Sequence, residues 1–421
     1  MRRILITRPP RFRLYTSRRS YGRFAFDAVF GPPGREDFVA RLEERLSEFL
    51  GVQHVVCTPM ARSGLFLALE QLVQPGQEVV LSPYTIGDVV NMVLAAGAIP
   101  VFADIEADSL NLSPAAVEKA IGPHTGAVLA THLHGIAART PALLAICRRA
   151  GVPLVEDAAQ SFGAVQDGRR LGTLGAAGVY SFGTYKNVNG WYGGAVATHD
   201  PQLAAAMRRR LATWPEQQLR TLLRRAAMGL LTDVATQPWM FRWLTFPLFR
   251  AALLRDNALA ARLARNEQAV ERRDYVTAAP RGRMTGAQGR LVAAQLAHVD
   301  PAARARIVRA TAYGEALAGL DAVRLPPPPE GMKNVYSYYP VRCADREGLL
   351  RWLVRHGHDV GAQHLHNCAD LETFAPFHRD CPETRRAAAE VVLLPTYPRY
   401  PLAAVRRTAA AIRTYYRRQR N

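Results

Sequence analysis

Short apolar runs and amphipathic stretches alternate along the first half of the chain, and this alternation limits the possible fold more than any other feature. We expect strands at 54–57, 78–83, 99–105, 125–135 and 152–158. Helices are expected around them at 36–50, 61–72, 88–97, 113–121 and 140–151. Apolar strands separated by helices indicate an α/β fold, with a large and mostly parallel sheet covered by helices. In such sheets a ligand binds at the carboxyl ends of the strands.

Polar side chains with catalytic potential stand at those carboxyl ends. They are His132, His134, Asp157, Gln160, Ser181 and Lys186. Lys186 is one of only three lysines among 54 basic residues. Arginine cannot replace lysine in forming an imine with a carbonyl cofactor, because its guanidinium stays protonated and is a poor nucleophile. Lys186 is therefore the candidate imine-forming residue, and the alternative is a solvated surface charge.

Asp157 follows the apolar run of a predicted strand, where a cofactor ring would lie. Pyridoxal phosphate needs a lysine for its Schiff base and a carboxylate that faces its pyridine nitrogen. Asp157 meets the second requirement, although an Asp at such a position is often a helix N-cap instead. Glu156 is the weaker candidate, because side chains alternate along a strand and Glu156 faces the other way.

Three further positions are candidate cofactor contacts. Ser181 lies five residues before Lys186 and carries a hydroxyl for the phosphate. Gln160 carries an amide for the phenolic oxygen of the cofactor, although a Gln there is otherwise ordinary polar surface. The segment Ala61–Gly64 opens a helix, and the free N–H groups of a helix N-terminus form an anion site.

Four segments resemble motifs of a known family, in the same order. They are AAGAIPVFADIEADSLNLSP at 95–114, VEDAAQSFGA at 155–164, VYSFGTYKNVNGWYGGAVAT at 179–198 and VVLLPTYPRYP at 391–401. With them, residues 36–402 resemble the DegT/StrS family of pyridoxal phosphate-dependent sugar-nucleotide aminotransferases. The resemblance implies the type I pyridoxal phosphate-dependent transferase fold, in which a large, mostly parallel sheet domain is joined to a small α/β C-terminal domain.

The resemblance also assigns roles to the candidate residues. It implies Lys186 as the Schiff-base lysine and general acid–base, and Asp157 as the partner of the pyridine nitrogen. Gln160 and Ser181 are implied as cofactor contacts. The dehydratase branch of the family carries histidine at the lysine position, so the resemblance implies a transaminase.

The chain departs from the family pattern at the cofactor-binding turns. The usual Gly-Thr phosphate turn reads Ala61-Arg62 here, so we expect the backbone amides, with Arg62 and Ser63, to bind the phosphate. Ile86 stands where an aromatic residue often stacks on the pyridine ring. Either Tyr84 replaces that aromatic residue, or an apolar contact from Ile86 suffices.

A homodimer with active sites at the subunit interface is a further implication of the resemblance. Where the family has Asn-x-Arg-Met, a segment that reaches the site of the neighbouring subunit, this chain has Arg281-Gly282-Arg283-Met284. We expect Arg281 to bind the cofactor phosphate of the neighbouring subunit. The alternative is an ordinary surface arginine.

Four histidines are candidate substrate contacts. His132 and His134 are expected on one face of the strand at 125–135. No third ligand for zinc accompanies them, so core packing or contact with a substrate hydroxyl is favoured and no metal site is predicted. His364 and His366 fall where the sugar-contacting C-terminal loop of the family lies, although its usual Tyr-Pro pattern is absent.

The chain is expected to divide into three parts. These are an N-terminal arm at 1–35, a large cofactor-binding domain at 36–275 and a small C-terminal domain with its connecting helix at 276–421. A helical, Arg-rich insertion at about 202–273 contains WMFRWLTFPLFR. Its aromatic and basic residues over 229–255 suit the surface of an anionic membrane. The favoured alternative is an extra helical hairpin packed on the fold or at a dimer interface.

Composition narrows the partners and the compartment. The formal net charge is +19, but no basic motif with interleaved aromatic residues appears, so nucleic acid is not an expected partner. Five scattered cysteines favour a reducing compartment. The chain has no apolar run long enough to span a membrane and no apolar segment typical of a secretory signal. We expect a cytoplasmic protein, peripheral to the inner membrane face if the insertion binds lipid.

These features together predict a pyridoxal phosphate-dependent aminotransferase. The expected donor is an amino acid, glutamate in the first place, and the expected acceptor is a keto group on a nucleotide-activated sugar. Such a reaction belongs to cell-envelope polysaccharide or secondary-metabolite biosynthesis. Two alternatives are open: an aminotransferase that acts on a non-sugar ketone or aldehyde, and a non-catalytic membrane-associated or regulatory protein on the same scaffold.

Overall fold

A seven-stranded sheet forms the centre of the computed structural model, which describes residues 8–14, 17–31, 37–254, 270–277, 281–328, 331–362 and 365–420. The strand order is β1-β10-β9-β6-β5-β2-β4. The strands are β1 (His54–Thr58), β2 (Glu78–Leu81), β4 (Ile99–Phe102), β5 (Thr125–Thr131), β6 (Leu154–Asp157), β9 (Ala177–Ser181) and β10 (Gly194–Thr198). Neighbours from β9 to β4 run parallel, whereas β10 is antiparallel to β1 and β9. The mostly parallel sheet predicted from the sequence is confirmed.

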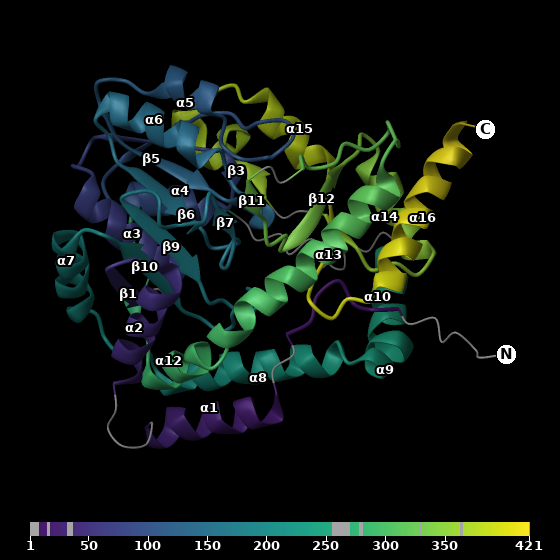
Figure 1. Ribbon diagram of the computed structural model, residues 1–421, viewed down its shortest axis with the longest axis horizontal. Helices are drawn as coiled ribbons and strands as arrows, with labels where there is room; N and C mark the ends of the chain where they lie inside the picture. The colour runs from purple at the N-terminus through teal and green to yellow at the C-terminus, as the bar shows by residue number, and fades with distance from the viewer. Residues whose placement is uncertain are drawn as a thin grey trace.

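Helices pack on both faces of this sheet (Figure 1). They are α3 (Ala61–Leu72), α4 (Gly87–Ala95) and α7 (Pro201–Ala212) on one face, and α5 (Pro114–Ala120) and α6 (Thr140–Ala150) on the other. Along β2, Val79 and Leu81 pack in the first cluster and Val80 in the second. This follows from the alternation of side chains along a strand, and burial on both faces explains why these strands are apolar throughout.

A second apolar core lies in the C-terminal part of the chain. Its sheet joins β12 (Tyr338–Arg342), β15 (Val391–Pro395) and β13 (Gly361–Ala362). The helices α13 (Val299–Leu317), α14 (Arg346–Arg355) and α16 (Leu402–Arg420) pack with this sheet. The two-stranded pair of β3 (Tyr84–Thr85) and β14 (His366–Asn367) connects this part to the large sheet unit.

Most of the described part of the insertion is helical. After α7 it comprises α8 (Leu219–Ala235), α9 (Pro238–Met240), one π-helical turn at Phe241–Thr245 and α10 (Phe246–Leu254). In Figure 1, α8 lies along the lower edge of the molecule beside α1 (Arg18–Phe30). A Cβ at Gly229 would come within 2.3 Å of the Trp191 ring, so glycine is what lets α8 pack so closely on that indole.

One local prediction is wrong. The strand expected at 125–135 ends at Thr131, and Leu133–Gly135 form a single 3₁₀ turn in which His134 has a φ of 57°. His132 and His134 therefore do not share one face of a strand. No helix in the described ranges is long and apolar enough to cross a membrane.

Candidate functional site

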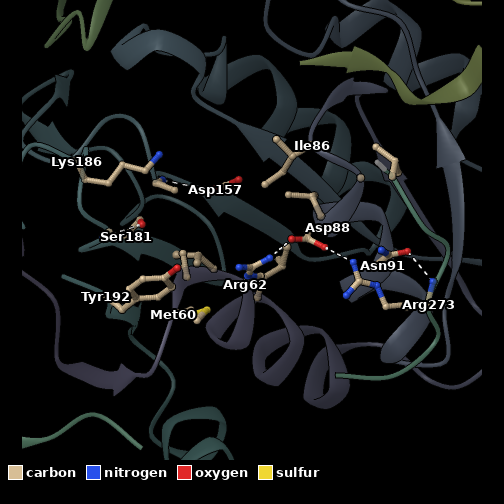
Figure 2. A pocket seen from close by; sticks show the side chains of 18 of the residues that line it. Met60, Arg62, Ile86, Asp88, Asn91, Asp157, Ser181, Lys186, Tyr192 and Arg273 are labelled. Carbon is tan, nitrogen blue, oxygen red and sulfur yellow. Dashed lines mark hydrogen bonds and ion pairs between the residues drawn. The ribbon is translucent and has the colours of Figure 1, made fainter. Parts of the chain in front are cut away.

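A pocket of about 350 Å³ opens at the carboxyl ends of β6 and β9 (Figure 2). Six of the sequence-predicted residues line it, namely Arg62, Ile86, Asp157, Ser181, Lys186 and His366. Asp88, Asn91, Tyr192, Glu271 and Arg273 complete much of its polar wall. The strand ends and the first turns of α3 and α4 thus converge on one cavity, as the parallel sheet requires.

Lys186 and Asp157 occupy the same part of this pocket. Burial lowers the pKa of the Lys186 ammonium, and the negative charge of Asp157 opposes that shift. Burial raises the pKa of Asp157, while a hydrogen bond from the backbone N–H of Ala159 at 3.0 Å and the charge of Lys186 oppose it. A desolvated amine is readily deprotonated, and the ionised form of a desolvated carboxylate is stabilised by a cationic partner. Lys119 and Lys333, the other two lysines, are exposed.

The N-terminus of α3 forms a second wall of the pocket. Met60, Ala61 and Arg62 line the cavity, and Met60 at the N-cap position provides no side-chain cap for the first N–H groups of the helix. Uncapped N–H groups at a helix N-terminus attract anions. Ser181 lies on the same cavity, where its hydroxyl accepts a hydrogen bond from the Gly183 N–H at 3.3 Å.

Two arginines near this wall, Arg225 and Arg273, were not predicted from the sequence. The Asp88 carboxylate forms ion pairs with Arg62 and, at 3.4 Å, with Arg273 (Figure 2). The Arg225 guanidinium of α8 lies 3.3 Å from the centre of the Tyr192 ring. Buried Arg225 Nη1 and Arg273 Nε have no hydrogen-bond partner among the described residues. In the lining itself the charges balance, with Arg62, Lys186 and Arg273 against Asp88, Asp157 and Glu271.

The segment that leaves the insertion closes one side of the pocket. The Asn91 side chain donates to the Glu271 carbonyl at 2.8 Å and accepts from the Arg273 N–H at 3.0 Å. Val270 packs so tightly over Gly87 that a Cβ at Gly87 would lie 2.2 Å from it. Asp88 and Asn91 belong to a predicted helix and Arg273 to no recognised motif, so only the tertiary structure brings them to the pocket.

Three predicted cofactor contacts do not line the pocket. Ser63 is fully buried inside the first turn of α3, and Tyr84 is fully buried in an apolar cluster with Leu133 and Leu393. The Gln160 side-chain oxygen accepts a hydrogen bond from the His134 N–H at 3.0 Å. The orientation of each side chain is set by packing around it, which the local sequence does not reveal.

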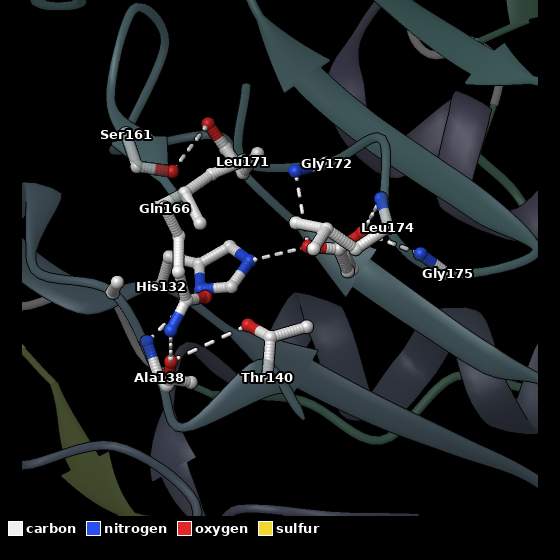
Figure 3. Close-up of polar contacts among 12 residues, drawn as sticks. His132, Ala138, Thr140, Ser161, Gln166, Leu171, Gly172, Leu174 and Gly175 are labelled. Carbon is white, nitrogen blue, oxygen red and sulfur yellow. Dashed lines mark hydrogen bonds and ion pairs between the residues drawn. The ribbon is translucent and has the colours of Figure 1, made fainter. Parts of the chain in front are cut away.

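His132 belongs to a buried network instead of the pocket (Figure 3). Its Nδ1 accepts from the Ala138 N–H at 3.1 Å, so the ring proton is on Nε2 and is donated to Glu156 at 3.0 Å. Glu156 also accepts backbone hydrogen bonds from Gly172, Leu174 and Gly175. His132 is therefore held in the core, where the core-packing alternative places it, and it does not line the pocket.

The remaining predicted residues differ in their surroundings. His134 is fully buried and does not line the pocket. His366 lines the pocket from β14, through the pairing of that strand with β3. Arg281 is exposed and lies outside the pocket of its own chain. His364 lies outside the described residues. Within the described ranges, no group of three or more His, Cys, Asp or Glu side chains is placed to bind a metal ion.

Curated proteins of known name match part of the chain. The Bacillus subtilis (strain 168) spore coat polysaccharide biosynthesis protein SpsC is 36% identical over 171 residues, which cover 40% of this chain and 44% of SpsC. The L-glutamine:2-deoxy-scyllo-inosose aminotransferase of Streptomyces kanamyceticus is 38% identical over 182 residues, 43% of each chain. The match thus spans less than half the length of these relatives.

Solved structures match nearly the whole chain. S. venezuelae DesV in complex with a ketimine intermediate has a TM-score of 0.74 at 26% identity, with 94% of each chain covered. The aminotransferase TlmJ from Streptoalloteichus hindustanus has a TM-score of 0.75 at 26% identity, with 97% of this chain and 98% of TlmJ covered. Both support the predicted type I transferase fold.

The family comparison covers most of the sequence. The model of the DegT/DnrJ/EryC1/StrS aminotransferase family matches residues 34–229 and 250–413. The first segment contains both Lys186 and Asp157, and the second contains His366. The chain therefore belongs to the DegT/DnrJ/EryC1/StrS aminotransferase family.

Proposed function

We propose that the protein is a pyridoxal phosphate-dependent aminotransferase that moves an amino group from an amino acid to a keto group of a nucleotide-activated sugar. The observation that carries the proposal is the pairing of Lys186 and Asp157 in one pocket, at the strand ends of a type I fold. Membership of an aminotransferase family supports it. The names of two relatives, a polysaccharide biosynthesis protein and a cyclitol aminotransferase, support a sugar-like acceptor.

The residues of the pocket fit pyridoxal phosphate at both of its ends. Lys186 provides the amine, Asp157 the anionic partner for a protonated pyridine nitrogen, and Ile86 an apolar surface for the ring. The N-terminus of α3, with Arg62 and Ser181, provides donors for the phosphate. When bound, this cofactor supplies a carbonyl that takes up the amino group and a ring that withdraws electrons from the reacting carbon.

The chain contributes proton transfer and charge. The Lys186 Nζ, whose pKa is lowered by burial, accepts the proton from the α-carbon of the amino donor and returns a proton to the former keto carbon of the acceptor. Asp157 stays ionised beside a cationic partner and stabilises it. His366 and Arg273 line the same pocket and are proposed to contact the substrate. Arg281 is proposed to contribute to the phosphate site of a partner subunit in a homodimer.

A two-part experiment tests this function. Purified protein is mixed with pyridoxal phosphate, reduced with borohydride and digested, and mass spectrometry then locates the labelled lysine. The expected label is on Lys186, and absence of any label contradicts the proposed cofactor. The cofactor-loaded protein is next assayed with glutamate or glutamine against keto-sugar nucleotides, keto-cyclitols and simple ketones. Turnover of the simple ketones alone would show that the acceptor is not a sugar. Labelling of Lys186 without turnover of any acceptor would favour a non-catalytic role.

Arg62→Ala is expected to weaken binding of pyridoxal phosphate by about ten- to a hundredfold, because a charge-assisted hydrogen bond is worth about 1.5–3 kcal/mol. Titration of cofactor absorbance measures this affinity without an assay of turnover. Arg149→Ala, at an exposed ion pair with Glu118, is the matched control and should leave the affinity unchanged. In the double variant Arg62→Ala/Asp88→Asn the weakening should persist. Recovery there would show that the freed Asp88 charge, and not the lost Arg62 contact, weakens binding.

A further inference from the structure

Large apolar side chains are exposed mainly on the insertion and on the helix beside it. Within the described ranges, every large apolar side chain more than 60% exposed lies on α1, α8 or the helical run at 238–254. These side chains are Phe30 (74%), Leu231 (63%), Trp239 (63%), Trp243 (71%) and Leu248 (62%). A soluble surface exposes single apolar side chains routinely, but a concentration of them marks an interaction site.

The two tryptophans are held in their outward orientation. Trp239 and Trp243 are four residues apart and so share one side of the helical run, and exposed Leu244 and Leu248 form a second pair at the same spacing. Phe241 and Phe246 point inward and are buried. The Thr245 hydroxyl donates to the Ala235 carbonyl at 2.9 Å, which fixes this run against the end of α8. The indole rings therefore stay at the surface.

Positive charge accompanies these apolar side chains. Arg220 and Arg224 are exposed on α8 and continue at helical spacing into exposed Met228 and Leu231. The Arg242 guanidinium lies 4.9 Å from the centre of the Trp243 ring. Asp233 is the single acidic residue between 217 and 254, and it is buried as the acceptor of the Tyr21 hydroxyl at 2.7 Å. The exposed surface of 217–254 thus carries arginine and no carboxylate.

We propose that this surface, called here the tryptophan face and formed by Leu231, Trp239, Trp243, Leu244 and Leu248 with Arg220, Arg224 and Arg242, docks on the surface of an anionic lipid bilayer. Indole rings and apolar side chains enter the interface between headgroups and acyl chains, while the arginines bind lipid phosphates. In this arrangement the helices of the tryptophan face lie in the plane of the interface.

Two observations favour lipid over a second copy of the chain. A twofold-symmetric contact would bring two positively charged faces together without a carboxylate to pair them. The family model stops at residue 229 and resumes at residue 250, so the segment with both tryptophans lies outside the pattern that family members share. The proposal does not depend on the proposed catalytic function.

Cosedimentation with vesicles tests the tryptophan face. The full-length protein is mixed with vesicles of phosphatidylcholine, alone or with phosphatidylglycerol. We expect binding to the anionic vesicles and at least roughly tenfold weaker binding to the neutral ones, because each surface arginine contributes about a factor of five. Trp239→Ser/Trp243→Ser and Arg220→Ser/Arg224→Ser should each weaken binding by at least about tenfold. Val308→Ser removes a 51% exposed apolar side chain from α13, away from this face, and should change nothing.

Several outcomes of this experiment would contradict the proposal. Absence of binding to anionic vesicles overturns it, and so does equal binding by the wild type and both double variants. Light scattering after size-exclusion chromatography gives the oligomeric state of each protein. A tryptophan variant that is monomeric where the wild type is dimeric would assign the face to a contact between copies of the chain. Unchanged far-UV circular dichroism and thermal unfolding of both variants show that they are folded.

Discussion

Lys186→Ala is expected to lower aminotransferase turnover by roughly a thousandfold or more and to abolish covalent attachment of pyridoxal phosphate. The reason is that Lys186 is the single lysine in the pocket, where burial lowers the pKa of its amine. Lys186→Arg should fail equally, because the guanidinium keeps the positive charge but remains protonated. Steady-state turnover and borohydride labelling measure the two effects separately.

The chain offers matched controls for this substitution. Lys119 and Lys333 are exposed and lie outside the pocket, so Lys119→Ala and Lys333→Ala should retain both turnover and labelling at Lys186. If Lys186→Ala kept a tenth or more of the wild-type turnover, Lys186 would not be the proton-transferring group. If the label in the wild type were found on Lys333 and not on Lys186, the assignment of Lys186 as the Schiff-base lysine would be contradicted directly.

Glu156→Ala is expected to lower the free energy of unfolding by about 3–5 kcal/mol, the cost of removing one partner from a buried charged network. The substitution leaves the His132 ring N–H and three backbone N–H groups without their acceptor in the protein interior. Denaturant or thermal unfolding measures the loss. Glu118→Ala, which breaks an ion pair with Arg149 between side chains that are both more than 60% exposed, should cost less than about 1 kcal/mol. Equal losses in the two variants would rule out this role for the buried network.

The contribution of Glu156 should also depend on pH. Burial alone raises the pKa of Glu156, but the hydrogen bonds from His132 and from the N–H groups of Gly175 and Gly172 outweigh it, so the pKa lies below its ordinary value. A carboxyl whose folded-state pKa is lowered stabilises the protein fully above its unfolded pKa, about 4.3 for Glu. That contribution is lost as the pH falls through the folded-state pKa. The difference in stability between the wild type and Glu156→Ala should therefore be constant near neutral pH and narrow below about pH 4.

The large sheet and part of the pocket follow from sequence patterns. Apolar strands separated by helices predict parallel strands, and parallel strands bring their carboxyl ends together, which places Asp157 beside Ser181 and Lys186. Alternation along β6 separates Asp157, in the pocket, from Glu156, in the buried network. These positions depend on short segments with regular periodicity, so they can be predicted from the sequence alone.

Other features depend on contacts between distant segments. Tyr84 pairs with Asn367 and is enclosed by apolar side chains from the C-terminal part, so its burial is not visible in the residues around it. Arg273 reaches the pocket because Asn91, 182 positions earlier, binds its backbone. His132 leaves the strand pattern because the chain turns at Leu133–Gly135. In each case long-range packing decides where a side chain points.

The backbone clamp between Asn91 and the segment 271–273 has a consequence for engineering this protein. A chimaera that exchanged the whole region 202–273 for the shorter connection of a relative would delete Arg273, the Val270 cover over Gly87 and the Arg225 neighbour of Tyr192. The surface helices and the wall of the pocket would then change in one step. A modular exchange must therefore cut between α10 and Val270, so that residues 270–277 stay with the recipient scaffold.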